Sequence, residues 1–172
     1  MLDIKNITIR KPVDQDLPAM SRIGVDGWYQ NFIDEDRGVD ADVLKNTYGQ
    51  EYDNPIKVDS LRNKVMNDAN TCFVADFEGK VIGWIDLENL HTPDISWLNI
   101  YVDKAWQGKG VGRLLMNSIL EKHGNIEIHV AIPEKANLKG FYEKFGFVEY
   151  PVTERVDVPG KLFMLQMKRD PS

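Results

Sequence analysis

The sequence predicts an α+β fold built on a mixed, mostly antiparallel sheet. Apolar residues recur at helical spacing in the first third of the chain, and three β-rich runs separated by turn residues follow. Helices and strands then alternate before two closing strands, an order that is typical of α+β proteins with a mixed sheet. The 172 residues contain no internal repeat or long Gly/Ser linker, so we expect one domain over residues 1–172.

The N-terminal third is predicted to be one strand followed by helices. The alternating, β-branched segment 6–10 favours a strand. Apolar residues at helical spacing then predict a helix through about Phe32, and the acidic run before Gly38 marks its end. Further helices are expected at 40–48 and at 54–70.

The middle of the chain is predicted to form an antiparallel meander. The β-rich runs 71–77 and 80–88 are joined by a Glu-Gly pair, which is typical of a tight hairpin. A third strand is expected at 95–102. A glycine-rich loop follows it and opens a helix that ends at Gly124.

The last quarter completes the sheet. We expect a strand at 126–132, a short helix at 137–145 stopped by Gly146, and two closing strands at 147–153 and 162–167.

Composition excludes several classes of protein. A net charge of −6 argues against general affinity for nucleic acid, and no apolar run approaches the roughly 20 residues of a membrane helix. The N-terminus lacks the basic start and apolar stretch of a secretory signal, so we expect a cytoplasmic protein in which the single cysteine, Cys72, is a buried thiol. Between Asp103 and Lys144, seven basic residues stand against five acidic ones. That balance suits a small anionic ligand, although chance variation between faces gives the same pattern.

The segment Gln107–Arg113, QGKGVGR, lies between a predicted strand and a predicted helix. Backbone N–H groups and the helix dipole bind phosphate at such a junction, and Lys109 and Arg113 add positive charge. A tight turn without a ligand is the alternative. The spacing does not fit a Rossmann fingerprint or a P-loop, and the antiparallel strands before it disfavour an S-adenosylmethionine site.

On these residues the chain resembles the GCN5-related N-acetyltransferase superfamily. Gln107-x-x-Gly110-x-Gly112 is similar to the family's Arg/Gln-x-x-Gly-x-Gly/Ala pyrophosphate loop, and 141–147, FYEKFGF, is similar to its helix with a tyrosine before Gly-Phe. The resemblance is clearest over 71–150. It implies six to seven strands flanked by helices on both faces, a splay between two central parallel strands, and acceptor-side helices within 12–70.

The resemblance also implies acetyl-coenzyme A as co-substrate, with no metal. The pyrophosphate would lie on the loop, the pantetheine arm would pair with the backbone at 100–102, and a backbone N–H near Ile100 or Tyr101 would stabilise the oxyanion. The family often has Asn seven residues before the tyrosine, where this chain has Lys135 and carries Asn137 two residues later. The cofactor-binding residues expected on this basis are Ile100, Tyr101, Val102, Gln107, Gly108, Lys109, Gly110, Val111, Gly112, Arg113 and Asn137.

Tyr142 is the expected general acid, because it matches the family's donor of a proton to the departing thiolate and a phenol is protonated at neutral pH. The family's glutamate has no counterpart here, since the corresponding places hold Ser96 and Leu98. The base therefore stays open among Asp86, Glu88, Asp94, His129 and water.

The expected acceptor is a primary amine of a small molecule or an amino-acid-like compound. A protein N-acetyltransferase and a non-catalytic acyl-coenzyme A sensor are the alternatives, and a homodimer through the C-terminal strands is compatible with the sequence. Aromatic residues of the first helix and of the meander either line the acceptor pocket or pack in the core; they are Trp28, Tyr29, Phe32, Trp84 and Trp97.

Overall fold

The computed structural model describes residues 6–49, 55–67, 70–92, 95–155 and 162–172. It contains a seven-stranded mixed sheet in the order β1-β2-β3-β4-β5-β7-β6, in which only the β4–β5 pair is parallel among the described strands. The predicted fold class is confirmed. The strands are β1 (Ile7–Arg10), β2 (Thr71–Phe77), β3 (Lys80–Thr92), β4 (Ile95–Val102), β5 (Glu127–Pro133), β6 (Val148–Arg155) and β7 (Leu162–Arg169).

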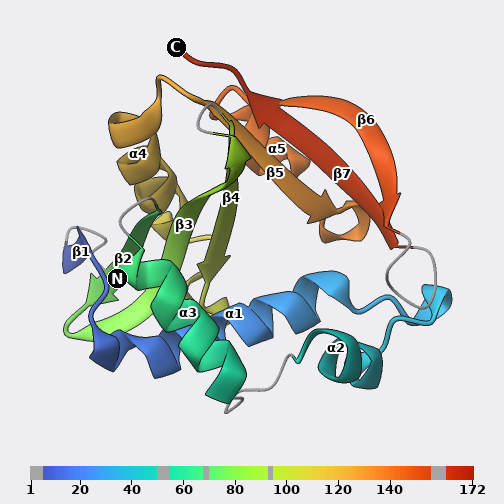
Figure 1. Cartoon of the computed structure of the whole chain (residues 1–172), viewed down its shortest axis with the longest axis horizontal. Coiled ribbons are helices and arrows are strands. Elements are labelled where there is room, and N and C mark those ends of the chain that lie inside the picture. Colours follow the sequence, from blue (N-terminus) through green and yellow to red (C-terminus); the bar gives the residue numbers. More distant parts are fainter. Residues whose placement is uncertain (1–5, 50–54, 68–69, 93–94, 156–161) are drawn as a thin grey trace.

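Helices cover both faces of the sheet (Figure 1). One face packs against α4 and α5 in the largest apolar cluster, and the other packs against α1 and α3. None of the described helices is both long and apolar enough to cross a membrane. The helices are α1 (Leu17–Phe32), α2 (Ala41–Tyr48), α3 (Pro55–Met66), α4 (Val111–His123) and α5 (Lys139–Glu143).

Three predicted elements have different bounds in the structure. The strand expected at 80–88 continues to Thr92 because it keeps pairing with β4. The helix expected at 54–70 begins at Pro55, a residue suited to the first helical position, and ends at Met66. The helix expected at 137–145 is confined to Lys139–Glu143, because Asn137 adopts the left-handed conformation with φ of 53°.

The long helix α1 lies unusually close to the sheet because two of its residues are glycines. A Cβ on Gly24 would lie 3.2 Å from the Trp84 ring, and one on Gly27 would lie 2.6 Å from the Tyr101 ring. Two indole N–H groups then fasten the contact: Trp84 donates to the carbonyl of Met20 at 2.9 Å, and Trp28 donates to the Tyr101 hydroxyl at 3.1 Å. This packing fixes α1 against β3 at Trp84 and against the C-terminal end of β4 at Tyr101.

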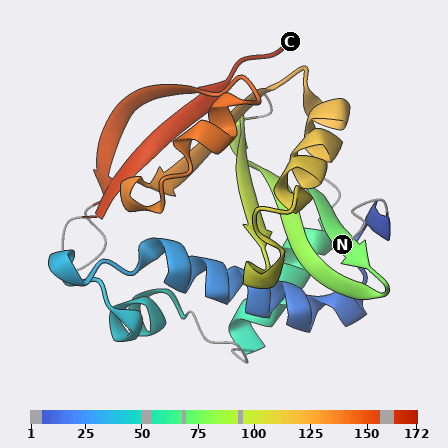
Figure 2. The same cartoon turned by 180° about the vertical axis from the view of Figure 1, so that it is seen from behind.

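The two halves of the sheet diverge between β4 and β5. Parallel pairing joins 95–97 of β4 to 127–129 of β5, and no ladder pair joins the two strands after Trp97. Beyond this point β4 stays paired with β3, and β5 with β7. Figures 1 and 2 show β5, β7 and β6 swinging away from the first four strands, with α1 crossing the open end. The predicted splay is therefore present.

Candidate active site

The glycine loop places the start of α4 beside the end of β4. The Asp103 carboxylate accepts a hydrogen bond from the backbone N–H of Ala105 at 2.9 Å and holds a short 3₁₀ turn. Gly108 and Gly110 follow with φ of 72° and 89°. No atom lies within 4 Å of a Cβ built on either residue, so the left-handed backbone, rather than lack of space, requires glycine there. The loop thus turns the N-terminus of α4 towards a cleft, where helix N–H groups suit an anion.

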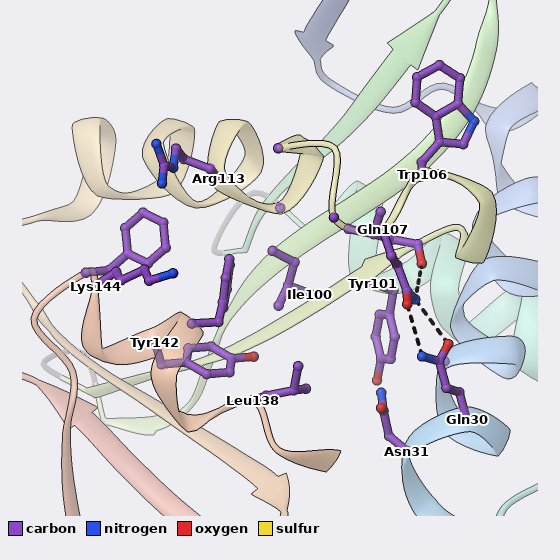
Figure 3. Close-up of a pocket in the computed structure, with 17 residues that line it drawn as sticks. Gln30, Asn31, Ile100, Tyr101, Trp106, Gln107, Arg113, Leu138, Tyr142 and Lys144 are labelled. Carbon is purple, nitrogen blue, oxygen red and sulfur yellow. Dashed lines mark hydrogen bonds between the residues drawn. The ribbon is translucent and has the colours of Figure 1, made fainter. Parts of the chain in front are cut away.

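This first cleft has a volume of about 500 Å³ and runs along 100–102 of β4 between the glycine loop and α5 (Figure 3). Two of the described residues that line it are charged, Arg113 and Lys144, and both are cationic. The cleft therefore combines an apolar strand edge with positive charge at a helix N-terminus. That combination fits a ligand with a long neutral arm and a phosphate group.

Most of the predicted cofactor-binding residues line the first cleft, and three do not. The Lys109 ammonium lies 5.4 Å from the centroid of the Trp106 ring, Val111 is buried in the core, and Asn137 precedes the lining residue Leu138. The predicted residues that line the cleft are Ile100, Tyr101, Val102, Gln107, Gly108, Gly110, Gly112, Arg113 and Tyr142.

The side chain of Gln107 ties three elements together at the mouth of the cleft. Its amide nitrogen donates to the carbonyl of Val102 at 3.0 Å and to the side-chain oxygen of Gln30 at 3.1 Å. Gln30 donates back to it at 3.0 Å, and Figure 3 shows this reciprocal pair. Gln107 therefore positions the loop against β4 and α1.

Tyr142 is buried on α5 and lines the first cleft. Its ring packs edge-on against Phe141 and Phe147, with centroids 5.2 and 5.6 Å away. Burial, and secondarily the nearby Tyr101, raises the pKa of the Tyr142 phenol above its ordinary value, so the group stays protonated. Figure 3 shows the hydroxyl pointing into the cleft, and it has no hydrogen-bond partner in the described part of the chain. The proton is thus available to a ligand.

A second cleft of about 400 Å³ opens in the splay, on the α1 side of the sheet. Trp28, Phe32 and Trp97 form part of its wall, whereas Trp84 is buried in the core and Tyr29 lies outside the lining. Five residues line both clefts, so the two spaces meet around Tyr142. The shared residues are Asn31, Ile100, Tyr101, Leu138 and Tyr142.

The structure separates the candidate bases. Glu88 lines the second cleft, as Tyr142 does. His129 lies outside the described lining, and its two ring nitrogens contact the Tyr150 hydroxyl at 2.8 Å and Glu127 at 2.6 Å. Asp94 lies outside the described residues. Glu88 is therefore the candidate carboxylate that faces the reacting space.

Asp86 lies behind the second cleft and is fully buried. One carboxylate oxygen is 3.3 Å from both the Lys64 ammonium and the Asn99 amide nitrogen, and the other has no partner in the described chain. Burial raises the pKa of Asp86 from 3.8 to about 6, against the opposing effect of Lys64. Lys64 also pairs with Glu88, so one cation holds two carboxylates.

Replacing Asp86 with Asn is expected to change the pH dependence of stability. A raised folded-state pKa means that the folded protein keeps a proton that the unfolded chain releases, so the wild type loses stability as pH rises from about 4 to about 6. Relative to the wild type, Asp86→Asn should gain about 3 kcal/mol of unfolding free energy across that window. Urea unfolding at each pH measures the difference in unfolding free energy between Asp86→Asn and the wild type, with exposed Glu121→Gln as the control. A difference that does not vary with pH would contradict the raised pKa of Asp86.

Sequence reasoning missed several cleft residues on α1 and at the two ends of α5. Gln30 and Asn31 lie on α1, and Leu138 and Lys144 flank α5; they reach the clefts only because both helices pack beside β4. A signal was present for α1, since Gly24 and Gly27 in a helix interior indicate close packing.

Comparison with known proteins agrees with this geometry. A family model described as an acetyltransferase (GNAT) domain matches residues 68–149. An uncharacterised N-acetyltransferase of Methanocaldococcus jannaschii is 28% identical over 98 residues, which are 51% of this chain and 43% of that relative. The match thus spans less than half of the relative's length.

Solved structures share the fold at low identity. A ribosomal-protein-alanine N-acetyltransferase of Brucella melitensis superposes with a TM-score of 0.69 and 22% identity, covering 95% of this chain and 99% of its own. The yncA protein of Salmonella typhimurium, solved with its cofactor acetyl-CoA, gives a TM-score of 0.70 and 20% identity, covering 97% and 95%. At these identities the likeness concerns the fold alone.

Proposed function

Because the chain belongs to the GCN5-related N-acetyltransferase superfamily, a superfamily of acyltransferase enzymes, we propose that it transfers an acetyl group from acetyl-CoA to a primary amine by direct attack. The observation that carries this proposal is the meeting of two clefts at Tyr142. One cleft has positive charge and a helix N-terminus, and the other contains the Glu88 carboxylate. Donor and acceptor can thus occupy separate clefts and meet at the shared residues.

The first cleft suits acetyl-CoA, which supplies the acetyl group as an activated thioester. The N–H groups of the loop between Gly108 and Arg113, together with Lys144, would hold the pyrophosphate. The unpaired edge of β4 at 100–102 would hold the pantetheine arm as an added strand. The Lys109 side chain and Asn137 are peripheral in this arrangement, and Lys109 and Val111 contribute through their backbone.

The residues around the junction then have distinct tasks. Glu88 accepts a proton from the acceptor's ammonium, directly or through water, which frees the nitrogen lone pair to form the new C–N bond. A backbone N–H at Ile100 or Tyr101 stabilises the negative charge that develops on the carbonyl oxygen. As the C–S bond breaks, the Tyr142 hydroxyl gives its proton to the departing sulfur, and the extra proton of the attacking nitrogen passes to the Tyr142 phenolate as the amide forms.

Titration calorimetry with acetyl-CoA, followed by thiol release with a panel of amines, tests the proposal. We expect a Kd in the micromolar range and thiol release that depends on the amine. The protein itself should contribute little background, because Cys72 is buried and burial raises the pKa of its thiol to about 12. Absence of acetyl-CoA binding, or binding with no release for any amine, would reject the proposed activity.

A further inference from the structure

The two clefts that meet at Tyr142 carry opposite charge. The charged described residues lining the first cleft are Arg113 and Lys144, and the charged described residue lining the second is Glu88. An anionic group of a ligand therefore meets cationic side chains in the first cleft. In the second cleft it has no cationic partner among the described lining residues. The uncharged polar residues of the described lining there are Asn31, Asn99, Gln166, Tyr101 and Tyr142.

Lys64, a cation beside the second cleft, is already engaged. Lys64 approaches from α3, lines a third cavity of about 300 Å³ rather than the second cleft, and pairs with both Glu88 and Asp86. The Glu88 side chain is 15% exposed, so it reaches the cleft while it keeps this pairing. The cluster has two carboxylates for one ammonium and therefore favours a further cation.

The remaining wall of the second cleft is largely apolar and aromatic. Trp28 and Phe32 stack with centroids 4.2 Å apart and an interplanar angle of 16°, and Trp97 contributes from β4. Leu98, Val130 and Met164 add aliphatic surface. Such a wall accepts an aryl or alkyl body and also favours an ammonium group over the ring faces.

Resting on the proposed function, we infer that the acceptor is an apolar primary amine, aryl- or alkyl-bearing, that carries no carboxylate. Glu88 recognises its ammonium, the aromatic wall holds its body, and the lining repels an amino acid with a free α-carboxylate. The sequence left the choice between a small-molecule amine and an amino-acid-like acceptor open, and this inference selects the small-molecule amine. Like charges forced together in a small, partly dehydrated space are strongly rejected.

Three acceptors of nearly equal shape test the inference: 2-phenylethylamine, L-phenylalanine and L-phenylalanine amide. With acetyl-CoA saturating, kcat/KM for 2-phenylethylamine should exceed that for L-phenylalanine by about 100-fold or more. The amide, which lacks the negative charge, should recover most of that difference. Equal rates with L-phenylalanine and its amide would overturn the inference while leaving the proposed activity standing.

Glu88→Gln separates recognition from catalysis. Loss of a base lowers the rate with every acceptor, whereas loss of the negative charge specifically relieves the rejection of L-phenylalanine. We expect the ratio of kcat/KM for 2-phenylethylamine to that for L-phenylalanine to fall by about 10-fold or more. Exposed Glu121→Gln on α4 is the matched control and should leave the ratio unchanged.

An unchanged ratio in Glu88→Gln would overturn the inference, as would faster turnover of an alanine-initiated peptide than of any free amine. If acetyl-CoA binds and none of these three acceptors releases thiol, the inference is overturned, and the proposed function fails with it only if no other amine of the panel releases thiol.

Discussion

Tyr142→Phe is expected to lower kcat by about 100-fold or more while the Kd for acetyl-CoA changes by less than about twofold. The hydroxyl points into the cleft and has no partner within the described chain, so its removal deprives the departing thiolate of a proton donor and breaks no structural hydrogen bond. The aromatic ring, which packs against Phe141 and Phe147, is retained. A 100-fold loss corresponds to about 3 kcal/mol of transition-state stabilisation.

Single-turnover kinetics under saturating acetyl-CoA measure this effect, and calorimetry measures cofactor binding in the same preparation. The melting temperature should change little, because the phenol's burial without a protein partner gives the folded state no hydrogen bond to lose. A kcat within threefold of the wild type would identify Tyr142 as a core aromatic and transfer the acid role to water. A large rise in the Kd for acetyl-CoA, or a large loss of stability, would instead indicate a packing role.

The glycine loop beside the first cleft could be predicted because its geometry is local in sequence. A strand end, three alternating glycines and a helix start favour a tight turn that opens a helix, and Gly108 and Gly110 adopt the positive φ that only glycine accepts readily. Tyr142 lies further along the chain on the short helix α5, which packs on the same face of the sheet as α4. Lys109 is expected at the site for its charge as well as its loop N–H, and the structure places its ammonium near the Trp106 ring.

The second cleft could not be predicted because distant segments build it. Asn31 of α1, Glu88 of β3 and Met164 of β7 line one cleft although they are far apart in sequence. Their proximity depends on where β4 and β5 stop pairing, which no single segment encodes. Glu88 could be named as a candidate base, but only the sheet register separates it from Asp86, which points to the same face and lies fully buried behind it.

Gly110→Val should weaken acetyl-CoA binding by about 100-fold. Gly110 caps the N-terminus of α4 with φ of 89°, a conformation that a β-branched residue strongly disfavours, so the peptide must rotate and re-aim the N–H groups of the loop. Loss of two charge-assisted hydrogen bonds to phosphate, each worth about 1.5 kcal/mol or more, gives a change of this size. Calorimetry with coenzyme A itself measures the effect, independently of any acceptor.

Gly38→Val is the matched control for backbone strain. Gly38 also has a left-handed backbone, with φ of 72°, has no atom within 4 Å of a built Cβ, and lies outside the described lining of both clefts. Both variants should lose a similar amount of stability, about 1–2 kcal/mol, through the same steric cost. Only Gly110→Val should lose affinity for coenzyme A. If the two variants bind coenzyme A equally well, the loop is merely a strand-to-helix turn, and the assignment of the first cleft to the pyrophosphate is wrong.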